Sequence, residues 1–209
     1  MPWLLSSSSW QKANPHFLMI KTGIFGGSFN PIHNGHISLA RQLKEKAGLD
    51  EVWLMVSPQN PMKRQADLLS DEARLLMARR ALEHETGIIA SDYEMHLPKP
   101  SYTWLTLQAL SRDYPDRQFV LMIGGDNWSI FHRWYHADDI LRNYQVVVYP
   151  RRGEQPAGEP LPAGVTMVEA ELLDVSSTEI RQRIREGRSI RHLVPPSVAT
   201  FIKQEGYYV

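Results

Sequence analysis

The stretch 26–36 constrains the fold most strongly, because it sets two adjacent glycines and two histidines between segments of different hydrophobic pattern. An apolar run precedes it at 19–25 and an amphipathic segment follows it at 37–46, which predicts a strand, a tight loop and a helix. Glycine backbone can approach a ligand closely because it carries no Cβ, and loop amides beside a helix N-terminus attract anions. We therefore expect a phosphate-binding loop in which His33 and His36 donate hydrogen bonds near the helix N-terminus.

Strands and helices alternate along the rest of the chain. Apolar and β-branched segments predict strands at 19–25, 51–56, 87–90, 119–123, 145–149 and 165–168. Helical spacing predicts helices at 34–47, 70–85, 100–113, 177–186 and 196–204, and short helices within 127–142. This alternation predicts an α/β fold, a Rossmann-like parallel sheet with helices on both faces and a helical C-terminal subdomain. Ligands of such sheets bind at the carboxyl ends of the strands, near the switch in strand order. The loops expected at those ends are 26–36, 57–63, 124–126 and 150–153.

The composition excludes several classes of protein. The 209 residues carry a formal net charge of zero, whereas a broad nucleic-acid surface requires an excess of basic residues. Cysteine is absent, so the chain has neither disulfide bonds nor thiolate metal ligands. No apolar run approaches the roughly 18 residues that a membrane span requires. We expect a cytoplasmic protein with no nucleic-acid or membrane partner.

Residues 1–18 differ in composition from the rest, since they include a low-complexity serine tract at 6–9. We interpret 1–18 as a non-functional N-terminal extension and 19–209 as a single domain, with Met19 able to serve as the initiator. The alternative is a loosely held arm that belongs to the protein. Deleting 1–18 is expected to leave activity intact, and loss of turnover in that truncation would refute the interpretation.

A second group of phosphate-binding residue types lies near the C-terminus. Ser176 with Glu179 fits a capping box, which predicts that a helix begins there. Taken alone, the capping box is best explained as a helix start. The hydroxyls of Ser177 and Thr178 and the guanidinium of Arg181 add to it, because they gather at the positive end of that helix. Arginine can bind two phosphate oxygens at once, so the group indicates a second phosphate site.

Two other interpretations of His33 and His36 stay open at this point, a structural role and a zinc pair. Zinc-binding histidines on a helix usually lie four residues apart, whereas these lie three apart with no third ligand nearby. The stretch 26–36 also lacks the Gly-Lys-Ser/Thr ending of a P-loop and the G-x-G-x-x-G fingerprint of a dinucleotide-binding oxidoreductase. Zinc and oxidoreductase chemistry are therefore disfavoured.

The two groups together resemble known signatures. The stretches 26–36 and 176–181 resemble the H-x-G-H and S-S-T-x-I-R signatures of the nucleotidyltransferase superfamily. Three further segments resemble the bacterial nicotinate-nucleotide adenylyltransferases, namely Pro-Ser-Tyr-Thr at 100–103, Gly-Gly-Asp at 124–126 and Trp-Tyr at 134–135. The resemblance covers essentially the whole of 19–209.

The resemblance implies magnesium-dependent transfer of an adenylyl group from ATP to nicotinate mononucleotide, giving nicotinate adenine dinucleotide and pyrophosphate, a step of NAD biosynthesis. The phosphate of the acceptor is already an anion at neutral pH, so the reaction needs positioning and charge stabilisation rather than a general base. The alternative acceptors are nicotinamide mononucleotide or another phosphate-bearing molecule such as phosphopantetheine. An alternative of another class is a regulatory nucleotide-binding module, which the intact phosphate donors argue against. The sequence does not distinguish a monomer from a homo-oligomer.

The resemblance also assigns residues. It implies catalytic roles for His33, His36, Thr178 and Arg181, the last two holding the departing phosphates. It implies contacts to ATP from Gly26, Gly27, Ser28, Phe29, Gly35, Gly124, Asp126 and Ser177, with Asp126 near the nucleotide sugars. It implies contacts to nicotinate mononucleotide from Lys63, Tyr102, Thr103, Trp134 and Tyr135, with Trp134 stacked on the nicotinate ring. No protein ligand for a metal is expected, because magnesium enters with the ATP phosphates. The sequence departs from many relatives at Asn30, where they carry aspartate, and at Met62, where they carry histidine; the second departure leaves the role of the 57–63 loop open.

Overall fold

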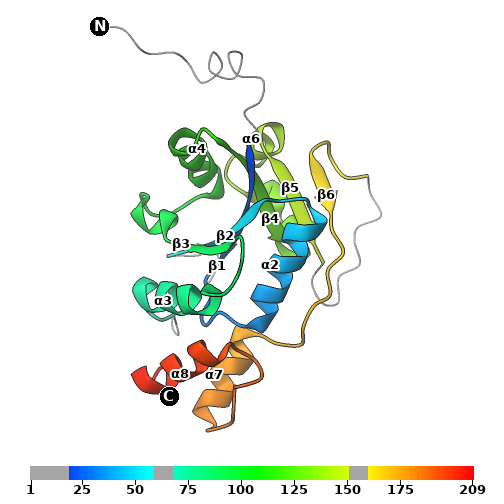
Figure 1. Cartoon of the computed structure of the whole chain (residues 1–209). Helices are drawn as coiled ribbons and strands as arrows, with labels where there is room; N and C mark the ends of the chain where they lie inside the picture. The colour runs from blue at the N-terminus through cyan, green and yellow to red at the C-terminus, as the bar shows by residue number, and fades with distance from the viewer. Residues whose placement is uncertain (1–18, 59–67, 151–159) are drawn as a thin grey trace, which may run out of the picture.

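The computed structural model describes residues 19–58, 68–150 and 160–209 (Figure 1). Its elements are β1 (Ile20–Gly27), α2 (Asn34–Lys46), β2 (Glu51–Val56), α3 (Asp71–Leu82), β3 (Ile88–Ser91), the 3-10 helix η1 (Tyr93–His96), α4 (Thr103–Asp113), β4 (Arg117–Gly124), α5 (Gly125–Ser129), the 3-10 helix η2 (Phe131–Arg133), α6 (Ala137–Asn143), β5 (Gln145–Tyr149), β6 (Val165–Met167), α7 (Ser177–Arg185) and α8 (Pro196–Glu205). None of the helices described is long and apolar enough to cross a bilayer.

The strands form one sheet in the order β3-β2-β1-β4-β5-β6, and every neighbouring pair is parallel. This is the predicted Rossmann-like α/β fold. The order reverses between β1 and β4, because the chain first builds outward from β1 to β3 and then returns to the other side of β1. The carboxyl ends of β1 and β4 therefore bound the crevice in which doubly wound sheets bind ligands.

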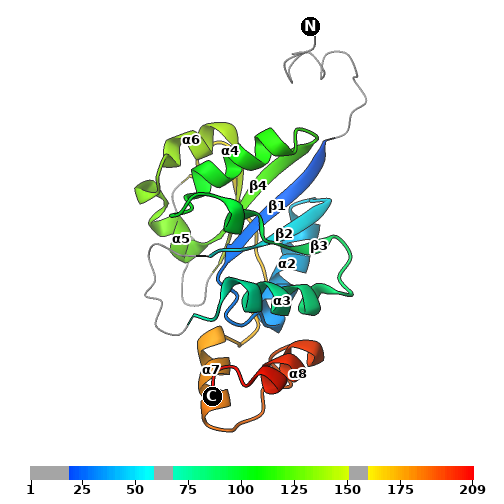
Figure 2. The same cartoon turned by 90° about the vertical axis from the view of Figure 1, so that its left-hand side faces the viewer.

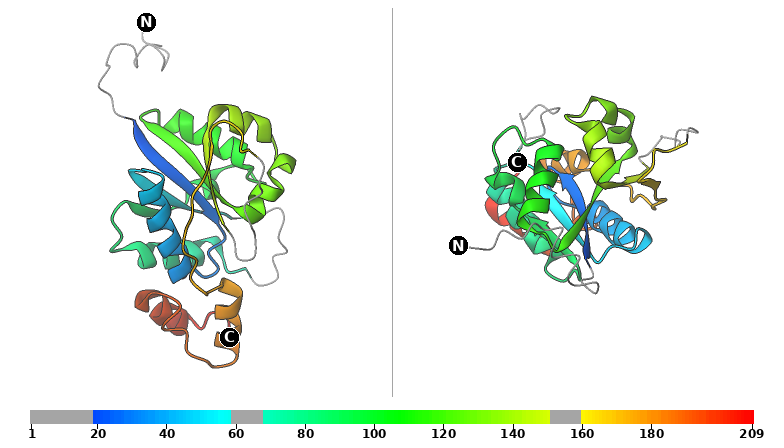
Figure 3. Two further views of the ribbon diagram at one scale, coloured as in Figure 1. Left: turned by 90° about the vertical axis from the view of Figure 1, so that its right-hand side faces the viewer. Right: turned by 90° about the horizontal axis from the view of Figure 1, so that it is seen from above.

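Apolar side chains alternate between the two faces of the sheet, as the period of a strand requires. Ile24 of β1 packs in one cluster with Leu107 of α4, whereas its neighbour Phe25 packs in the other with Leu43 of α2. Helices therefore cover both faces, with α2 and α3 on one and α4 and α6 on the other (Figures 2 and 3).

The helical C-terminal segment lies beyond the carboxyl end of β1, where Figures 1 and 2 show α7 and α8 below the sheet. It is not a separate layer. Ile180 of α7 and Phe201 of α8 belong to the same buried cluster as Phe25 and Leu43. Burying side chains of this size contributes about 1.5–3 kcal/mol each, so the core itself attaches α7 and α8 to the sheet.

Two differences from the predicted element boundaries bear on the site. Strand β1 continues through Gly26 and Gly27, because these glycines pair with the last residues of β2. Helix α4 begins at Thr103 rather than 100, because Tyr102 has extended backbone and caps the helix. The short helices predicted at 127–142 are confirmed as α5, η2 and α6. The first difference makes the two glycines the end of a strand rather than part of a loop.

Candidate active site

The first functional stretch follows β1 directly. Gly27 permits a close turn, since a Cβ at this position would lie 2.9 Å from the Phe29 ring. Phe29 has a φ of 45°, and its side chain is buried against Phe25 and His36, with ring centroids 5.9 and 4.9 Å away. Its side chain thus supports the His36 ring from the core, and only its backbone remains to face a ligand. Gly26 is exposed at the carboxyl end of β1, and Ser28 is half-buried.

The two histidines form a reciprocal cap at the N-terminus of α2. The Nδ1 of His33 accepts a hydrogen bond from the His36 amide at 3.4 Å, and the Nδ1 of His36 accepts one from the His33 amide at 3.3 Å. The rings stack with centroids 3.6 Å apart. Because both Nδ1 atoms are acceptors, the ring proton of each neutral imidazole is on Nε2. Each Nε2 is therefore a donor, and the first turn of α2 contains no acidic residue to oppose the positive end of the helix.

Gly35 allows the second functional stretch to approach the first. A Cβ on Gly35 would lie 2.8 Å from Cγ1 of Val175 and 3.1 Å from Nδ1 of His33. Val175 precedes Ser176, the N-cap residue of α7, so the absence of a side chain at Gly35 sets the distance between the beginnings of α2 and α7.

The N-terminus of α7 is attached to the loop before α2. Ser177 Oγ donates to the carbonyl of Pro31 at 2.9 Å, although the two residues are 146 positions apart. Arg181 Nη1 donates to the carbonyl of Asn30 at 2.8 Å, and its Nη2 lies 3.4 Å from Thr178 Oγ1. The structure thus brings the two predicted phosphate-binding stretches together, with the N-termini of two helices side by side.

Helix α7 begins as the sequence predicts, since Ser176 Oγ accepts from the Glu179 amide at 3.1 Å. Thr178 is exposed and Arg181 is half-buried. Within the described residues, the buried Nε of Arg181 has no hydrogen-bond partner. An unpaired buried donor is costly, and here it lies on a guanidinium that already reaches toward the 26–36 stretch.

A second group of predicted residues lies around the N-terminus of α4. The Tyr102 and Tyr135 rings are 4.8 Å apart, and the two side chains are 38 % and 48 % exposed. Trp134 is half-buried and lies 5.2 Å from the Phe131 ring. The contact between the tyrosines brings the start of α4, with Thr103, next to the 134–135 segment, so this group presents aromatic faces and a hydroxyl.

Two further predicted residues lie at the carboxyl end of β4, the strand next to β1. Gly124 is buried at the end of β4, and Asp126 is exposed in α5, which follows it. Lys63 lies outside the described residues. In the described part of the chain, no group of three or more histidine, aspartate or glutamate side chains is placed to hold a metal ion.

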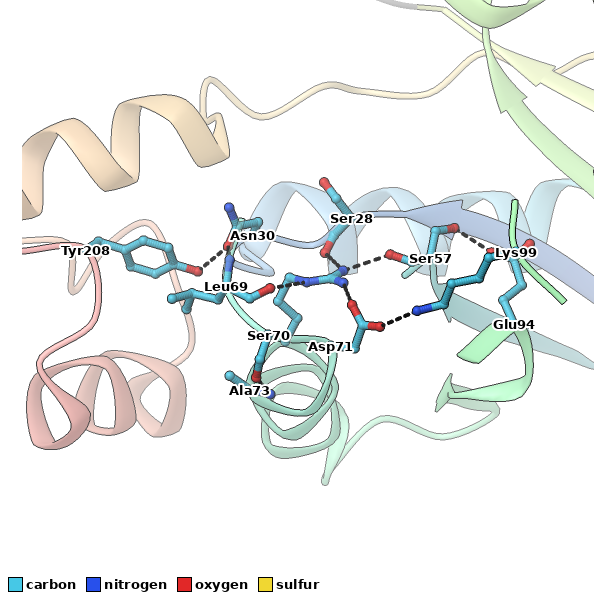
Figure 4. A network of polar contacts seen from close by, with 11 residues as sticks. Ser28, Asn30, Ser57, Leu69, Ser70, Asp71, Ala73, Glu94, Lys99 and Tyr208 are labelled. Carbon is cyan, nitrogen blue, oxygen red and sulfur yellow. Dashed lines mark hydrogen bonds and ion pairs between the residues drawn. The ribbon is translucent and has the colours of Figure 1, made fainter. Parts of the chain in front are cut away.

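A buried polar network that the sequence did not predict lies beside the glycines. Arg74 of α3 is fully buried and donates to the carbonyls of Ser28, Ser57 and Leu69 at 2.7, 2.9 and 3.0 Å. Glu94 of η1 is 8 % exposed and accepts from Ser57, and Figure 4 shows Ser28, Ser57 and Glu94 side by side. The sequence contains one signal that Arg74 is buried, because its spacing places it on the same face of α3 as the buried apolar residues.

The pKa of the Glu94 carboxyl is raised above its ordinary value, because burial penalises the charged form. Hydrogen bonds from Ser57 and Thr106 lower it, and their effect is smaller than that of burial.

Comparisons with known proteins agree with this geometry. Residues 24–183 match a family model described as cytidylyltransferase-like. The chain is 47 % identical over 185 residues to the "Probable nicotinate-nucleotide adenylyltransferase" of Bacteroides fragilis, which covers 88 % of this chain and 92 % of that protein. It is 44 % identical over the same length to the protein of that name from Bacteroides thetaiotaomicron.

The solved structures show a shared fold at lower sequence identity. Nicotinic acid mononucleotide adenylyltransferase of Plasmodium falciparum in complex with NaAD is 18 % identical, with a TM-score of 0.75 over 90 % of this chain and 97 % of that one. The complex of that enzyme with APC gives a TM-score of 0.74 at 18 % identity, over 90 % of this chain and 96 % of that one.

Proposed function

This chain belongs to the nicotinate-nucleotide adenylyltransferases, within the cytidylyltransferase-like family, and we propose how its residues divide the work of that reaction. It is an enzyme that transfers the adenylyl group of ATP to nicotinate mononucleotide in NAD biosynthesis. A phosphate oxygen of the mononucleotide attacks the α-phosphorus of ATP, the bond to the bridging oxygen of the β-phosphate breaks, and pyrophosphate leaves.

No residue is required to activate the nucleophile. The second pKa of a phosphate monoester is about 6, so the attacking group is anionic at neutral pH. The task of the protein is to hold two anions in line and to stabilise the charge that develops on the α-phosphate and on pyrophosphate.

The reciprocal cap of His33 and His36 is the observation that carries the assignment. It makes Nε2 the donor atom of each ring at the positive end of α2, the helix that follows the exposed Gly26 at the end of β1. These donors bind the α-phosphate, and the charge on its oxygens grows in the transition state. Removing one well-placed donor of this kind costs on the order of 100-fold in rate.

The N-terminus of α7 binds the other end of the triphosphate. Ser177, Thr178 and Arg181 supply hydroxyl and guanidinium donors there, and the contacts of Ser177 and Arg181 with the loop before α2 fix their distance from the histidines. Arg181 neutralises the β- and γ-phosphates as they depart.

The acceptor binds at the start of α4. Trp134 stacks on the nicotinate ring, because a flat aromatic ring favours a flat partner. Thr103 and the backbone amide of Tyr135 bind the nicotinate carboxylate, with Tyr102 beside them and Asp126 near the nucleotide sugars. Lys63 binds a substrate phosphate. ATP and nicotinate mononucleotide are thus the partners of this enzyme, which works in the cytoplasm, where ATP is available.

Magnesium is the expected cofactor. The chemistry of the side chains at the site indicates how the ion would be held. The side chains at the two helix N-termini offer N–H and O–H groups, which bind anions, whereas magnesium prefers carboxylate, water and phosphate oxygens. The triphosphate itself, rather than protein ligands, therefore holds the ion, which neutralises phosphate charge when bound.

A substrate comparison tests the function. Purified protein is given Mg-ATP with nicotinate mononucleotide, nicotinamide mononucleotide or phosphopantetheine, and pyrophosphate release is measured. Release with the first acceptor is expected. Absence of release with that acceptor would end the proposal, whereas a preference for the second would change only the substrate.

Two variants of one residue test the mechanism. His36→Asn keeps an acceptor at the position of Nδ1, so the cap survives while the Nε2 donor is lost; His36→Ala loses both. Both are expected to lower kcat by about 100-fold or more, and the exposed His84→Ala serves as the matched control. Near-normal turnover of His36→Asn would show that the Nε2 donor has no catalytic role.

A further inference from the structure

A buried carboxyl near the site has no part in the reaction described above. Glu94 lies in η1, between β3 and α4, and is 8 % exposed. Adenylyl transfer to an anionic phosphate needs no general base, so the chemistry does not require this carboxyl. Burying a carboxyl is costly unless hydrogen bonds compensate it, and an apolar side chain would occupy the same space without that cost.

The two oxygens of Glu94 contact two different elements. Ser57 Oγ, just after β2, donates to Oε2 at 2.7 Å, and Thr106 Oγ1, in the first turn of α4, donates to Oε1 at 3.0 Å. The amide of Thr106 in turn donates to the carbonyl of Tyr102 at 3.0 Å, the residue that caps α4. A single carboxyl thus bridges the carboxyl end of β2 and the N-terminal turn of α4.

Ser57 is itself fixed to the end of β1. Its amide donates to the carbonyl of Gly27 at 3.0 Å. Arg74 Nη1 donates to the carbonyls of both Ser57 and Ser28, so one fully buried guanidinium holds the ends of β1 and β2 at a set distance. In Figure 4 Ser57 lies between Ser28 and Glu94. A continuous polar chain therefore runs from the 26–36 stretch to helix α4.

Resting on the proposed function, we propose that Glu94 is a positioning residue for the acceptor: through Ser57 and Thr106 it holds the first turn of α4, which carries Thr103, in place relative to the phosphate-binding loop. Glu94 touches neither substrate in this arrangement. It acts by fixing where the donors for the nicotinate carboxylate lie with respect to the α-phosphate of ATP.

Steady-state kinetics with each substrate varied in turn tests this role. Thr106→Val removes one hydroxyl at nearly constant volume, Ser57→Ala removes the other while keeping the carbonyl that Arg74 binds, and Glu94→Gln keeps the shape. Each is expected to raise the KM for nicotinate mononucleotide about two- to tenfold, the effect of one lost hydrogen bond, with the KM for ATP unchanged. Thr166→Val, exposed on β6, is the matched control.

The double variant Glu94→Gln/Thr106→Val sharpens the test. Either change alone interrupts the same bridge from Ser57 through Glu94 to Thr106, so together they are expected to raise the KM for nicotinate mononucleotide no more than either alone. A purely structural role predicts a lower melting temperature with equal changes in both KM values. That result, or an unchanged KM for nicotinate mononucleotide, would overturn the inference.

The activity of the wild-type enzyme distinguishes a failure of this inference from a failure of the proposed function. If it releases no pyrophosphate with nicotinate mononucleotide, the proposed function fails. If it turns over that acceptor and the variants leave its KM unchanged, the positioning role alone fails. Should Glu94→Gln not fold, Thr106→Val and Ser57→Ala give the same decision, since Glu94 is intact in both.

Discussion

Gly35→Ala perturbs the contact on which the active site depends. The new methyl group would lie 2.8 Å from Cγ1 of Val175 and 3.1 Å from Nδ1 of His33, whereas unstrained carbon contacts are about 3.5–4.0 Å. Val175 has a short, branched side chain with a single rotatable bond, and the His33 ring is held by its capping hydrogen bond. Neither neighbour can move without separating α7 from α2 or breaking the cap.

The two free-energy terms of this substitution oppose each other. Overpacking costs about 1–3 kcal/mol, while replacing a helical glycine by alanine gains about 0.5–1 kcal/mol. The net loss of stability is therefore about 0–2.5 kcal/mol, which lowers the melting temperature by at most about 10 °C for a chain of this size. The effect on turnover is larger, since displacing the Nε2 donors costs on the order of 100-fold in kcat.

Gly48→Ala is the matched control. Gly48 has a φ of 60° and nothing within 4 Å of its added Cβ, so the cost is purely conformational, about 1–2 kcal/mol. Calorimetry and a pyrophosphate-release assay on both variants should give comparable melting temperatures with activity lost only in Gly35→Ala. A Gly35→Ala enzyme as active as the wild type, or activity loss that simply follows stability in both, would refute the reasoning.

Two further predictions concern stability. Tyr208→Phe removes the hydroxyl that donates to Asn30 Oδ1 at 2.7 Å and is expected to cost about 0.5–1.5 kcal/mol, measured by urea unfolding; an unchanged midpoint would contradict it. Because the folded-state pKa of Glu94 is raised, its contribution to stability is present at low pH and is lost as pH rises through that pKa. The melting temperature of Glu94→Gln relative to wild type should therefore increase from pH 5 to pH 8, and a pH-independent difference would exclude this linkage.

The sequence by itself determined the order of the elements and the two signature stretches. Hydrophobic period and capping residues act locally, so the strand before 26–36, the helix after it and the cap at Ser176 could all be predicted. The alternation of strands and helices then restricted the fold to a parallel sheet, whose carboxyl ends form the site.

Only the tertiary structure decided which side chains meet. The contact of Ser177 with Pro31 and the approach of Val175 to Gly35 join residues far apart in the chain, and no local pattern encodes such distances. Arg74 illustrates the reason, since its helical phase places it with the buried residues of α3, but nothing near it in the sequence shows which carbonyls it meets. Its position follows from the carbonyls that the strand ends present to α3, because a buried guanidinium is stable only where such acceptors converge on it.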